Sequence, residues 1–327
     1  MLRVGAVGCG EIGLVHQQAF QSHPEAELRC VCDLVPAKAD VRAGLLGVTA
    51  YYSVEEMLAN EELDAVDVVT ADTLHFEPCF QALEAGKHVL VEKPLTFDLD
   101  EARRLVTKAE EKGVCLAINY NRRFGLAYQT GKRWLDEGRL GKLCYIVLRQ
   151  SQGGPYGARK PYHMMWDMGG HMFDLLRHFG GDIVSLRAEM TDVRNTGYYT
   201  SLAVSLKFAN QAVGTLLLSW DSVFHNGLEY MELCGDQGRC TMHEVNQAAY
   251  LYPHQGNEKT FVETDPFFGY QFDDTFRRRV HTFVDDLVAG RSPQPSGKDG
   301  LVSLELACLC IQSFEQDTVV KPLSATE

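Results

Sequence analysis

The sequence predicts an α/β protein in which a doubly wound parallel sheet is followed by a second α/β domain with an open, largely antiparallel sheet. Three observations predict it. The chain opens on a short apolar run that leads into a glycine turn, its first third alternates such runs with amphipathic stretches, and its later part carries consecutive runs of period-two patterning. Alternating strands and helices are typical of βαβ units and parallel sheets, whereas consecutive alternating strands indicate antiparallel pairing.

Short apolar runs place the strands of the parallel sheet at about residues 2–7, 28–33, 66–70, 88–92 and 115–118. Helical periodicity predicts helices over 12–20, 77–84 and 99–112. The last of these ends at Gly113, a residue type that commonly caps helix C-termini.

The pattern changes after residue 120. We expect helices over 131–137, 168–179, 275–287 and 300–314, and strands over 143–149, 199–208, 212–220 and 229–234. No internal repeat or flexible linker separates the two parts. The predicted domains are therefore residues 1–120 and residues 121–327.

Charge and cysteine usage exclude several classes of protein. The chain has 327 residues, and 31 Lys and Arg against 44 Asp and Glu give a net charge of -13, which disfavours nucleic acid and anionic membranes as partners. The first strand starts directly after Met1, so we expect no signal peptide. The ten cysteines are scattered without metal-ligand spacing. This favours reduced packing residues, no metal site and a cytoplasmic location.

The glycine turn Gly8-Cys9-Gly10-Glu11-Ile12-Gly13 follows the first strand and precedes a helical pattern. In this context glycines permit a tight turn, close approach of backbone to a pyrophosphate, and close packing of helix on strand. Asp33 lies twenty residues beyond Gly13, at the end of the second strand, where a carboxylate binds the ribose 2′-hydroxyl of NAD and repels the 2′-phosphate of NADP. NAD is the predicted cofactor. The alternative is that Asp33 only starts the turn before Pro36.

The strand expected over 88–92 ends in Glu92-Lys93-Pro94, at the edge where open α/β sheets bind ligands. An ammonium there can hold a substrate oxygen, so Lys93 is a candidate catalytic residue. The alternative is a surface lysine that happens to end a strand. Glu92 either pairs with Lys93 or contacts the cofactor ribose.

Polar residues form a stripe along the helix predicted over 168–179, beginning one residue before it. Asp167, His171, Asp174 and His178 are spaced i, i+4, i+7 and i+11 and would share one face. The alternative is a solvated face with helical ion pairs. Gly169-Gly170 favours a site, because two glycines cost helix stability and are tolerated where backbone passes close to a ligand.

The whole chain resembles the Gfo/Idh/MocA family of NAD(P)-dependent oxidoreductases. Three motifs in this order carry the resemblance: Gly8-x-Gly10-x-x-Gly13, residues 85–94 with Glu92-Lys93-Pro94, and residues 167–174 with His171. The resemblance implies a Rossmann domain, then an α/β domain whose open sheet often forms subunit contacts, and action on sugars or cyclitols. A homo-oligomer, dimer or tetramer, is expected. Ala71 and Gly170 depart from the family pattern, which has proline and a branched apolar residue there.

Oxidation of a secondary alcohol requires a base for the hydroxyl proton and a positive group for the developing alkoxide. His171 suits the first role and Lys93 the second, and both match the family motifs. The resemblance adds Asp167 beside the substrate hydroxyls and the histidine. We expect further cofactor contacts from Glu11, Ile12, Thr70, His75, Glu92 and Lys93, although His75 would also fit as a residue that caps or packs the helix at Phe76.

Substrate contacts are expected from Lys93, Arg122, Tyr162, His163, Asp167 and His171. The aromatic and donor residues before the predicted helix suit the faces and hydroxyls of a sugar ring, but they would equally suit a subunit interface. Arg122 would equally fit a domain-junction ion pair. The loops over 153–163, with Tyr156 and Arg159, and over 222–227 are expected to decide which substrate binds.

The sequence thus predicts an NAD-dependent sugar or cyclitol dehydrogenase, or the reverse reductase. Two alternatives stay open. One is a catalytically silent regulator that binds nucleotide and metabolite, since a fold does not fix function. The other is a redox-neutral enzyme that recycles the hydride, as in epimerisation or glycoside cleavage.

Overall fold

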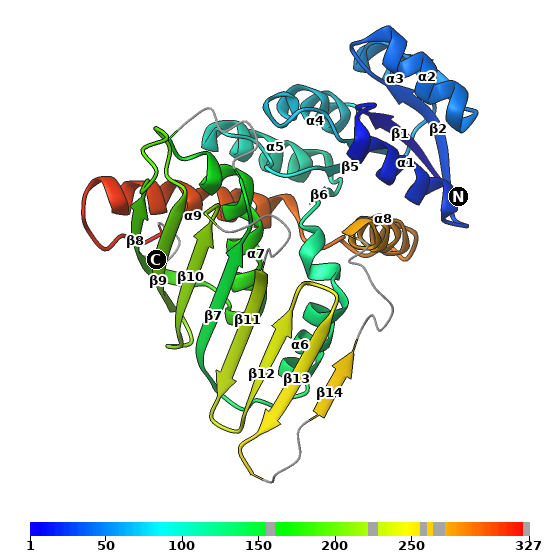
Figure 1. The fold of residues 1–327 in the computed structure, drawn as a ribbon. Coiled ribbons are helices and arrows are strands. Elements are labelled where there is room, and N and C mark those ends of the chain that lie inside the picture. The colour runs from blue at the N-terminus through cyan, green and yellow to red at the C-terminus, as the bar shows by residue number, and fades with distance from the viewer. Residues whose placement is uncertain (155–160, 222–227, 256–259, 264–271, 323–327) are drawn as a thin grey trace. The chain divides into compact units, whose positions relative to one another are not determined.

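A computed structural model describes residues 1–154, 161–221, 228–255, 260–263 and 272–322 (Figure 1). The chain forms two compact units. The first comprises Met1–Asn121 with Phe272–Leu304, and the second comprises Arg122–Gln271 with Glu305–Glu327.

The first unit contains a six-stranded parallel sheet with the order β3-β2-β1-β4-β5-β6. Its strands are β1 (Leu2–Val7), β2 (Ala26–Cys32), β3 (Thr49–Tyr51), β4 (Ala65–Val68), β5 (His88–Val91) and β6 (Leu116–Ile118). Its helices are α1 (Glu11–Ser22), α2 (Pro36–Leu46), α3 (Val54–Asn60), a 3-10 turn (Asp72–Leu74), α4 (Phe76–Glu84), α5 (Leu99–Lys112) and α8 (Phe272–Val288). This is the doubly wound sheet that the alternating pattern predicts.

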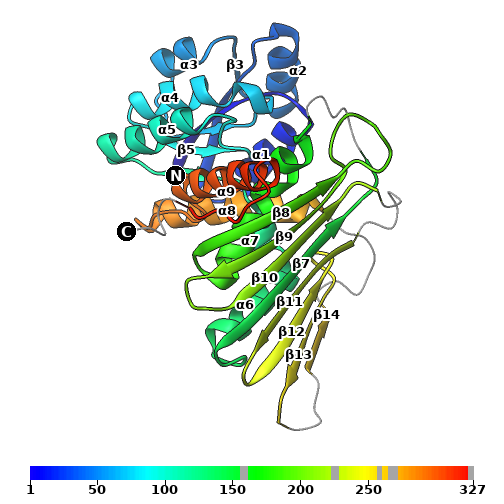
Figure 2. The same cartoon turned by 90° about the vertical axis from the view of Figure 1, so that its left-hand side faces the viewer.

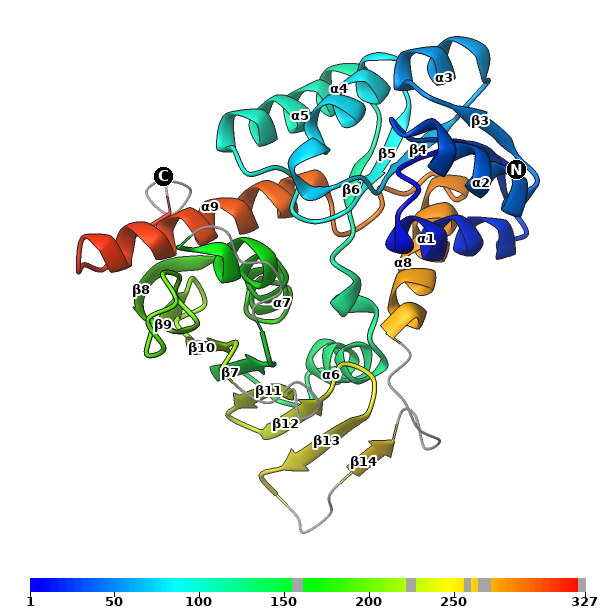
Figure 3. The ribbon, with the colours of Figure 1, turned by 45° about the horizontal axis from the view of Figure 1, so that its top comes forward.

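Helices cover both faces of this sheet. Figure 3 shows α1 and α8 side by side on one face and α4 with α5 on the other. Sequence analysis assigns α8 to the second domain. The structure packs it in the first unit, because Val280, Phe283 and Val284 of α8 share a buried core with Phe20 of α1.

The second unit is built on an eight-stranded sheet with the order β14-β13-β12-β11-β7-β10-β9-β8. Its strands are β7 (Leu143–Ser151), β8 (Ile183–Thr191), β9 (Ser201–Phe208), β10 (Val213–Ser219), β11 (Leu228–Gly235), β12 (Gly238–His243), β13 (Ala248–Pro253) and β14 (Thr260–Glu263). Its helical segments are a 3-10 turn (Asn121–Phe124), α6 (Leu126–Asp136), a π-helical turn (Met165–Gly169), α7 (Gly170–Gly180) and the C-terminal part of α9 (Gly297–Glu315).

This sheet is mostly antiparallel, as predicted, and β7 with β10 is its one parallel pair among the described strands. Buried and exposed residues alternate along β9 and β10. Helices α6 and α7 cover one face, and no helix of the described residues covers the other (Figures 1 and 2). The sheet therefore has the open face that period-two patterning predicts.

The cysteines match their expected role as packing residues. All ten cysteines are free, and six are buried. Burial raises the pKa of the Cys9 thiol to about 11, which suits packing residues rather than reactive ones. Among the described residues, no group of three or more metal-ligating side chains is assembled, and none of the helices is long and apolar enough to cross a bilayer.

Candidate cofactor and active site

The glycine turn between β1 and α1 has the shape that a dinucleotide requires. Gly8 has φ +108°, and a Cβ there would lie 2.2 Å from the Val69 carbonyl oxygen. A Cβ on Gly13 would lie 2.4 Å from the Gly8 oxygen, whereas a Cβ on Gly10 would meet nothing within 4 Å. The turn is thus tight where it must be and open at Gly10. No side chain caps the N-terminus of α1, which leaves its N–H groups facing the place of a pyrophosphate.

Side chains brace this turn from behind. The Gln17 amide donates to the Gly8 carbonyl at 3.0 Å, and Arg42 donates to Gln17 Oε1 at 2.5 Å. Arg42 Nη2 also donates to the carbonyls of Cys9 and Gly10, each at 3.1 Å. The carbonyls of the turn are therefore occupied, and the uncapped N–H groups at the start of α1 are left for an anion.

Asp33 lies directly beside the turn. Its Oδ2 accepts a hydrogen bond from the Cys9 N–H at 2.9 Å, and its Oδ1 accepts one from the Val35 N–H at 2.9 Å. The carboxylate thus bridges the glycine turn and the turn before α2. The bond to Val35 is the turn contact of the alternative interpretation, and binding of the ribose by Asp33 stays a prediction. It is half-buried, at the end of β2, where the ribose of NAD is bound in doubly wound folds. The residues present fit NAD.

We expect Asp33→Ser to reduce the preference for NAD over NADP by about tenfold or more, because the substitution removes the charge that repels a 2′-phosphate. Titration of both cofactors, followed by nicotinamide fluorescence, measures this ratio. Asp40→Ser is the control, since Asp40 is an exposed carboxylate on α2 that accepts from Tyr52 at 2.8 Å. An unchanged ratio in Asp33→Ser would refute the role given to Asp33.

The turn after β5 is held by buried groups. Glu92 Oε2 accepts the backbone N–H of Lys93 at 3.0 Å, and the Lys93–Pro94 peptide is cis. Buried His75 lies on the other side: its Nδ1 donates to the Pro94 carbonyl at 2.6 Å, and its Nε2 is 3.3 Å from the Thr70 oxygen. His75 makes no side-chain capping bond to α4. It instead joins the turns after β4 and β5, and Lys93 is half-buried at this edge.

A buried polar network lies behind Glu92, and sequence analysis missed it. His16 on α1 places Nδ1 3.1 Å from Asp67 Oδ1 and Nε2 3.2 Å from Glu92 Oε1. The Asn119 amide donates to Glu92 and lies 3.0 Å from His16 Nε2. Burial opposes the charge of His16, but the carboxylates of Asp67 and Glu92 outweigh it and raise the pKa of His16 to about 10. His16 is therefore a buried cation at neutral pH.

This pairing predicts a pH-dependent stability. The pKa of His16 is about 10 in the folded chain against an ordinary 6.5, so its stabilisation is complete below about 6.5 and is lost as the pH rises through 10. We expect the free energy of unfolding to fall over this interval by an amount on the order of a few kcal/mol. Urea denaturation at several pH values measures it. The fall should be much smaller in His16→Gln, and equal slopes in both proteins would contradict the assignment.

In the second unit, His171 and Asp174 lie on α7 and are 4% and 0% exposed. Asp174 forms a two-bond ion pair with Arg123, at 2.7 Å to Nε and 2.5 Å to Nη2. These two residues are therefore not on a solvated helix face. Asp167, half-buried, sits in the π-helical turn before α7, a geometry that is frequent at functional sites.

Gly169 packs closely against the protein itself. The sequence predicts that backbone passes close to a ligand at Gly169-Gly170. A Cβ on Gly169 would instead lie 2.4 Å from the Met165 sulfur, so side-chain packing accounts for this glycine.

The predicted substrate residues of this unit make several protein contacts. Arg122 is buried, and its Nε lies 3.0 Å from Glu229 Oε2. This ion pair lies within the second unit. Tyr162 donates to Glu315 at 2.6 Å and stacks on Tyr199, with ring centroids 5.3 Å apart. The roles of Arg122 and Tyr162 as substrate ligands stay predictions. Tyr156, Arg159 and the loop over 222–227 lie outside the described residues.

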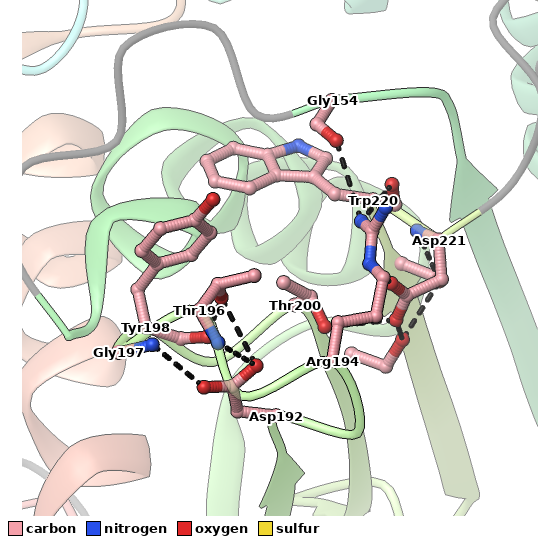
Figure 4. Close-up of polar contacts among 11 residues, drawn as sticks. Gly154, Asp192, Arg194, Thr196, Gly197, Tyr198, Thr200, Trp220 and Asp221 are labelled. Atoms are coloured by element: carbon pink, nitrogen blue, oxygen red, sulfur yellow. Dashed lines mark hydrogen bonds and ion pairs between the residues drawn. The ribbon is translucent and has the colours of Figure 1, made fainter.

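The structure adds Trp220, which sequence analysis did not single out. Its ring centroid lies 5.8 Å from that of His163, and its indole nitrogen makes no hydrogen bond within the described part of the chain. Figure 4 shows the polar contacts around its backbone: Arg194 donates to the Trp220 carbonyl at 3.3 Å and lies 2.8 Å from Asp221, which also accepts from Thr200 at 2.9 Å. The sequence feature that could have identified Trp220 is its place as an aromatic residue at the end of a strand with period-two patterning.

Each unit thus gathers its own group of predicted residues. The first unit brings Asp33 to the glycine turn, and it brings Thr70, His75, Glu92 and Lys93 to the carboxyl edge of the same sheet. The second unit places Asp167 and His171 in one continuous helical segment, with Tyr162 and His163 immediately before it.

Comparison with known proteins matches these two halves. Residues 2–120 match a model of an oxidoreductase family with an NAD-binding Rossmann fold, and residues 128–241 match the GFO/IDH/MocA C-terminal domain. A myo-inositol 2-dehydrogenase from Thermotoga maritima is 26% identical over 331 residues, covering 98% of each chain. A scyllo-inositol 2-dehydrogenase (NAD(+)) from Bacillus subtilis is 26% identical over 337 residues, covering 98% of this chain and 96% of the relative.

Solved structures agree in fold. A probable dehydrogenase from Thermotoga maritima superposes with a TM-score of 0.86 at 25% identity, and 98% of each chain is covered. A levoglucosan dehydrogenase in complex with NADH and levoglucosan has a TM-score of 0.88 at 20% identity, with 98% of this chain and 99% of that one covered.

Proposed function

This chain belongs to the Gfo/Idh/MocA family of NAD-dependent oxidoreductases, and from that membership we propose that it oxidises a secondary alcohol of a sugar or cyclitol, or reduces the corresponding ketone. The observation that carries the proposal is the carboxyl edge of the first sheet. There the open glycine turn, Asp33 and the half-buried Lys93 lie on one parallel sheet. A dinucleotide site with a lysine at the same edge suits a redox reaction at a carbinol.

NAD fits the turn formed by Gly8, Gly10 and Gly13, with its pyrophosphate at the N-terminus of α1 and its ribose at Asp33. When bound, NAD supplies the acceptor for the hydride that leaves the carbinol carbon. The chain must supply the remainder of the chemistry, which is a path for the hydroxyl proton and a counter-charge for the oxygen.

Lys93 is proposed to hold the substrate oxygen. Its ammonium donates a hydrogen bond to the hydroxyl and stabilises the negative charge that develops as the O–H bond breaks. The turn after β5 supports this role, since bonds from Glu92 and His75 fix the backbone on both sides of the lysine. A fixed donor contributes more than a mobile one because it needs no reorganisation at the moment of reaction.

His171 is proposed to be the general acid and base. In oxidation its imidazole would take the hydroxyl proton while the carbinol C–H electron pair leaves as hydride to the bound acceptor, so that the carbinol would become a ketone and the imidazolium would release its proton to water. In reduction the same steps run backwards. Asp167, in the π-helical turn before α7, is proposed to bind a substrate hydroxyl and orient the histidine.

The substrate class rests on two observations. The relatives named above are inositol dehydrogenases. His163 is half-buried and lies beside the buried ring of Trp220. An imidazole donor next to an aromatic ring suits the hydroxyls and apolar faces of a polyol ring. We propose a cyclic polyol, an inositol or a pyranose, as substrate.

The test is a screen of NAD reduction against inositols, hexoses, pentoses and their phosphates, followed by the absorbance of reduced nicotinamide. The proposal expects at least one cyclic polyol to be oxidised with kcat/KM of about 10⁴ M⁻¹s⁻¹ or more. Two alternatives predict other outcomes. A silent regulator binds NAD and polyol without turnover, and a hydride-recycling enzyme forms product without net reduced nicotinamide.

A further inference from the structure

The network behind Glu92 contains more charge than a sheet core requires. His16 and Asp67 are both 0% exposed, and Asp67 lies within β4 between Val66 and Val68, where an apolar residue would serve the packing. Placing ionised groups in a core costs several kcal/mol per ion unless they are paired and hydrogen-bonded. A network of this kind therefore needs a reason beyond the fold.

The geometry identifies the group that the network serves. Only a protonated imidazole donates from both ring nitrogens, and His16 faces a carboxylate with each: Asp67 at 3.1 Å and Glu92 at 3.2 Å. Arg279 of α8, also fully buried, donates to the carbonyls of Ile118 and Pro295 and contributes a second cation near Asp67. Burial raises the pKa of Asp67 above its ordinary value, and the charges of His16 and Arg279 oppose that rise.

Glu92 joins this network to Lys93. Burial raises the pKa of Glu92, but the hydrogen bond and charge of His16 outweigh it, so that the pKa lies below its ordinary value and the carboxylate stays ionised. The two Glu92 oxygens have separate tasks. Oε1 faces His16 and the Asn119 amide, and Oε2 accepts the Lys93 backbone N–H at 3.0 Å.

We propose that His16 is a positioning residue for Lys93. It holds the Glu92 carboxylate in one orientation, and Glu92 in turn fixes the peptide from which the catalytic ammonium projects. His16 itself is buried beneath the edge and touches neither substrate nor cofactor. The proposal rests on the function proposed above, in which Lys93 holds the substrate oxygen.

The test compares His16→Gln with the native enzyme under turnover with NAD and a cyclic polyol. We expect kcat to fall about tenfold or more, since a misplacement of about 1 Å costs up to 10²-fold, while the Kd of NAD changes less than about threefold. His23→Gln is the matched control: His23 directly follows the same helix and also contacts a carboxylate, Asp285 at 3.2 Å, but it is outside the network. It should leave kcat unchanged.

A second variant separates positioning from general stability. Glu92→Gln removes the charge that His16 holds, so in that background His16→Gln should lower kcat by less than about threefold. If the double variant lost kcat by the product of the two single-variant factors, the two residues would act independently and the proposal would be overturned. Native kcat in His16→Gln would overturn it as well. If His16→Gln does not fold, the lowered kcat of Glu92→Gln at unchanged NAD affinity is the expected result, and native kcat in it contradicts the inference.

A structural measurement that needs no turnover tests the positioning role of His16 separately from the proposed function. In a crystal structure of NAD-bound His16→Gln, the Glu92 carboxylate should leave the Lys93 N–H, and the lysine should shift by about 1 Å. An unmoved Lys93 refutes the positioning role. Absence of turnover in the native enzyme with every polyol counts against the proposed function alone.

Discussion

Lys93→Ala is expected to lower kcat/KM about 10³-fold, because it removes the cation that stabilises the developing alkoxide. The Kd of NAD should change less than about threefold, since the glycine turn and Asp33 make their contacts without the lysine side chain. Steady-state kinetics with the best polyol and calorimetric titration of NAD measure the two effects separately.

Lys87→Ala is the matched control for Lys93. Lys87 is half-buried and immediately precedes β5, so it lies at the opposite end of the same strand, away from the carboxyl edge. Its loss should leave kcat/KM within about twofold. Native kcat/KM in Lys93→Ala, at a polyol concentration well below KM, would remove the lysine from the mechanism.

His171→Gln is expected to lower kcat by about 10²- to 10⁴-fold, the usual contribution of a positioned general base. The residual rate should rise steadily with pH, because hydroxide then removes the substrate proton. NAD affinity should persist, since the glycine turn and Asp33 form their contacts without the His171 side chain.

His178→Gln is the matched control on the same helix. His178 lies two turns further along α7, half-buried, with its ring edge against Phe179 at a centroid distance of 5.3 Å. Its substitution should leave kcat and the pH profile unchanged. Equal losses in the two variants would mean that disturbance of α7, rather than loss of a base, explains the effect of His171→Gln.

Elements with a strong local signal were predictable from the sequence. The helix expected over 99–112 is observed as Leu99–Lys112, and Gly113 ends it with φ +65°. Helix α2 was missed because its large apolar residues do not mark its buried face: Val41 and Leu45 are 73% and 64% exposed, whereas the buried residues are the small Ala39 and Ala43. Strand β3 has only three residues, too few to show a period.

The second sheet was harder to predict than the first. Strand β8 was missed because Arg187 and Glu189 interrupt its apolar residues, although Leu186 and Ala188 are buried in alternation. Strands β12, β13 and β14 were also not predicted. The parallel pairing of β7 with β10 joins segments more than sixty residues apart, and no local pattern specifies such a partner.

In the candidate site, too, residues that are adjacent in sequence could be predicted, whereas residues that meet only in the fold could not. The motifs around Gly8 and Lys93 were readable because their residues are adjacent in sequence. The His16 network was not, because its members come from helix α1, strand β4 and the residues that directly follow β5 and β6, and they meet only in the fold. One signal was present: Asp67 interrupts an otherwise apolar strand, and an acid there requires a buried partner.

The most direct test of the account follows one atom. The enzyme is incubated with NAD and the cyclic polyol that the screen identifies, deuterated at the carbinol carbon, and the products are examined by mass spectrometry. The account predicts deuterium on the reduced nicotinamide, with one equivalent of ketone formed per equivalent of cofactor. Product that keeps its deuterium, or that forms without reduced cofactor, would contradict an NAD-dependent dehydrogenase.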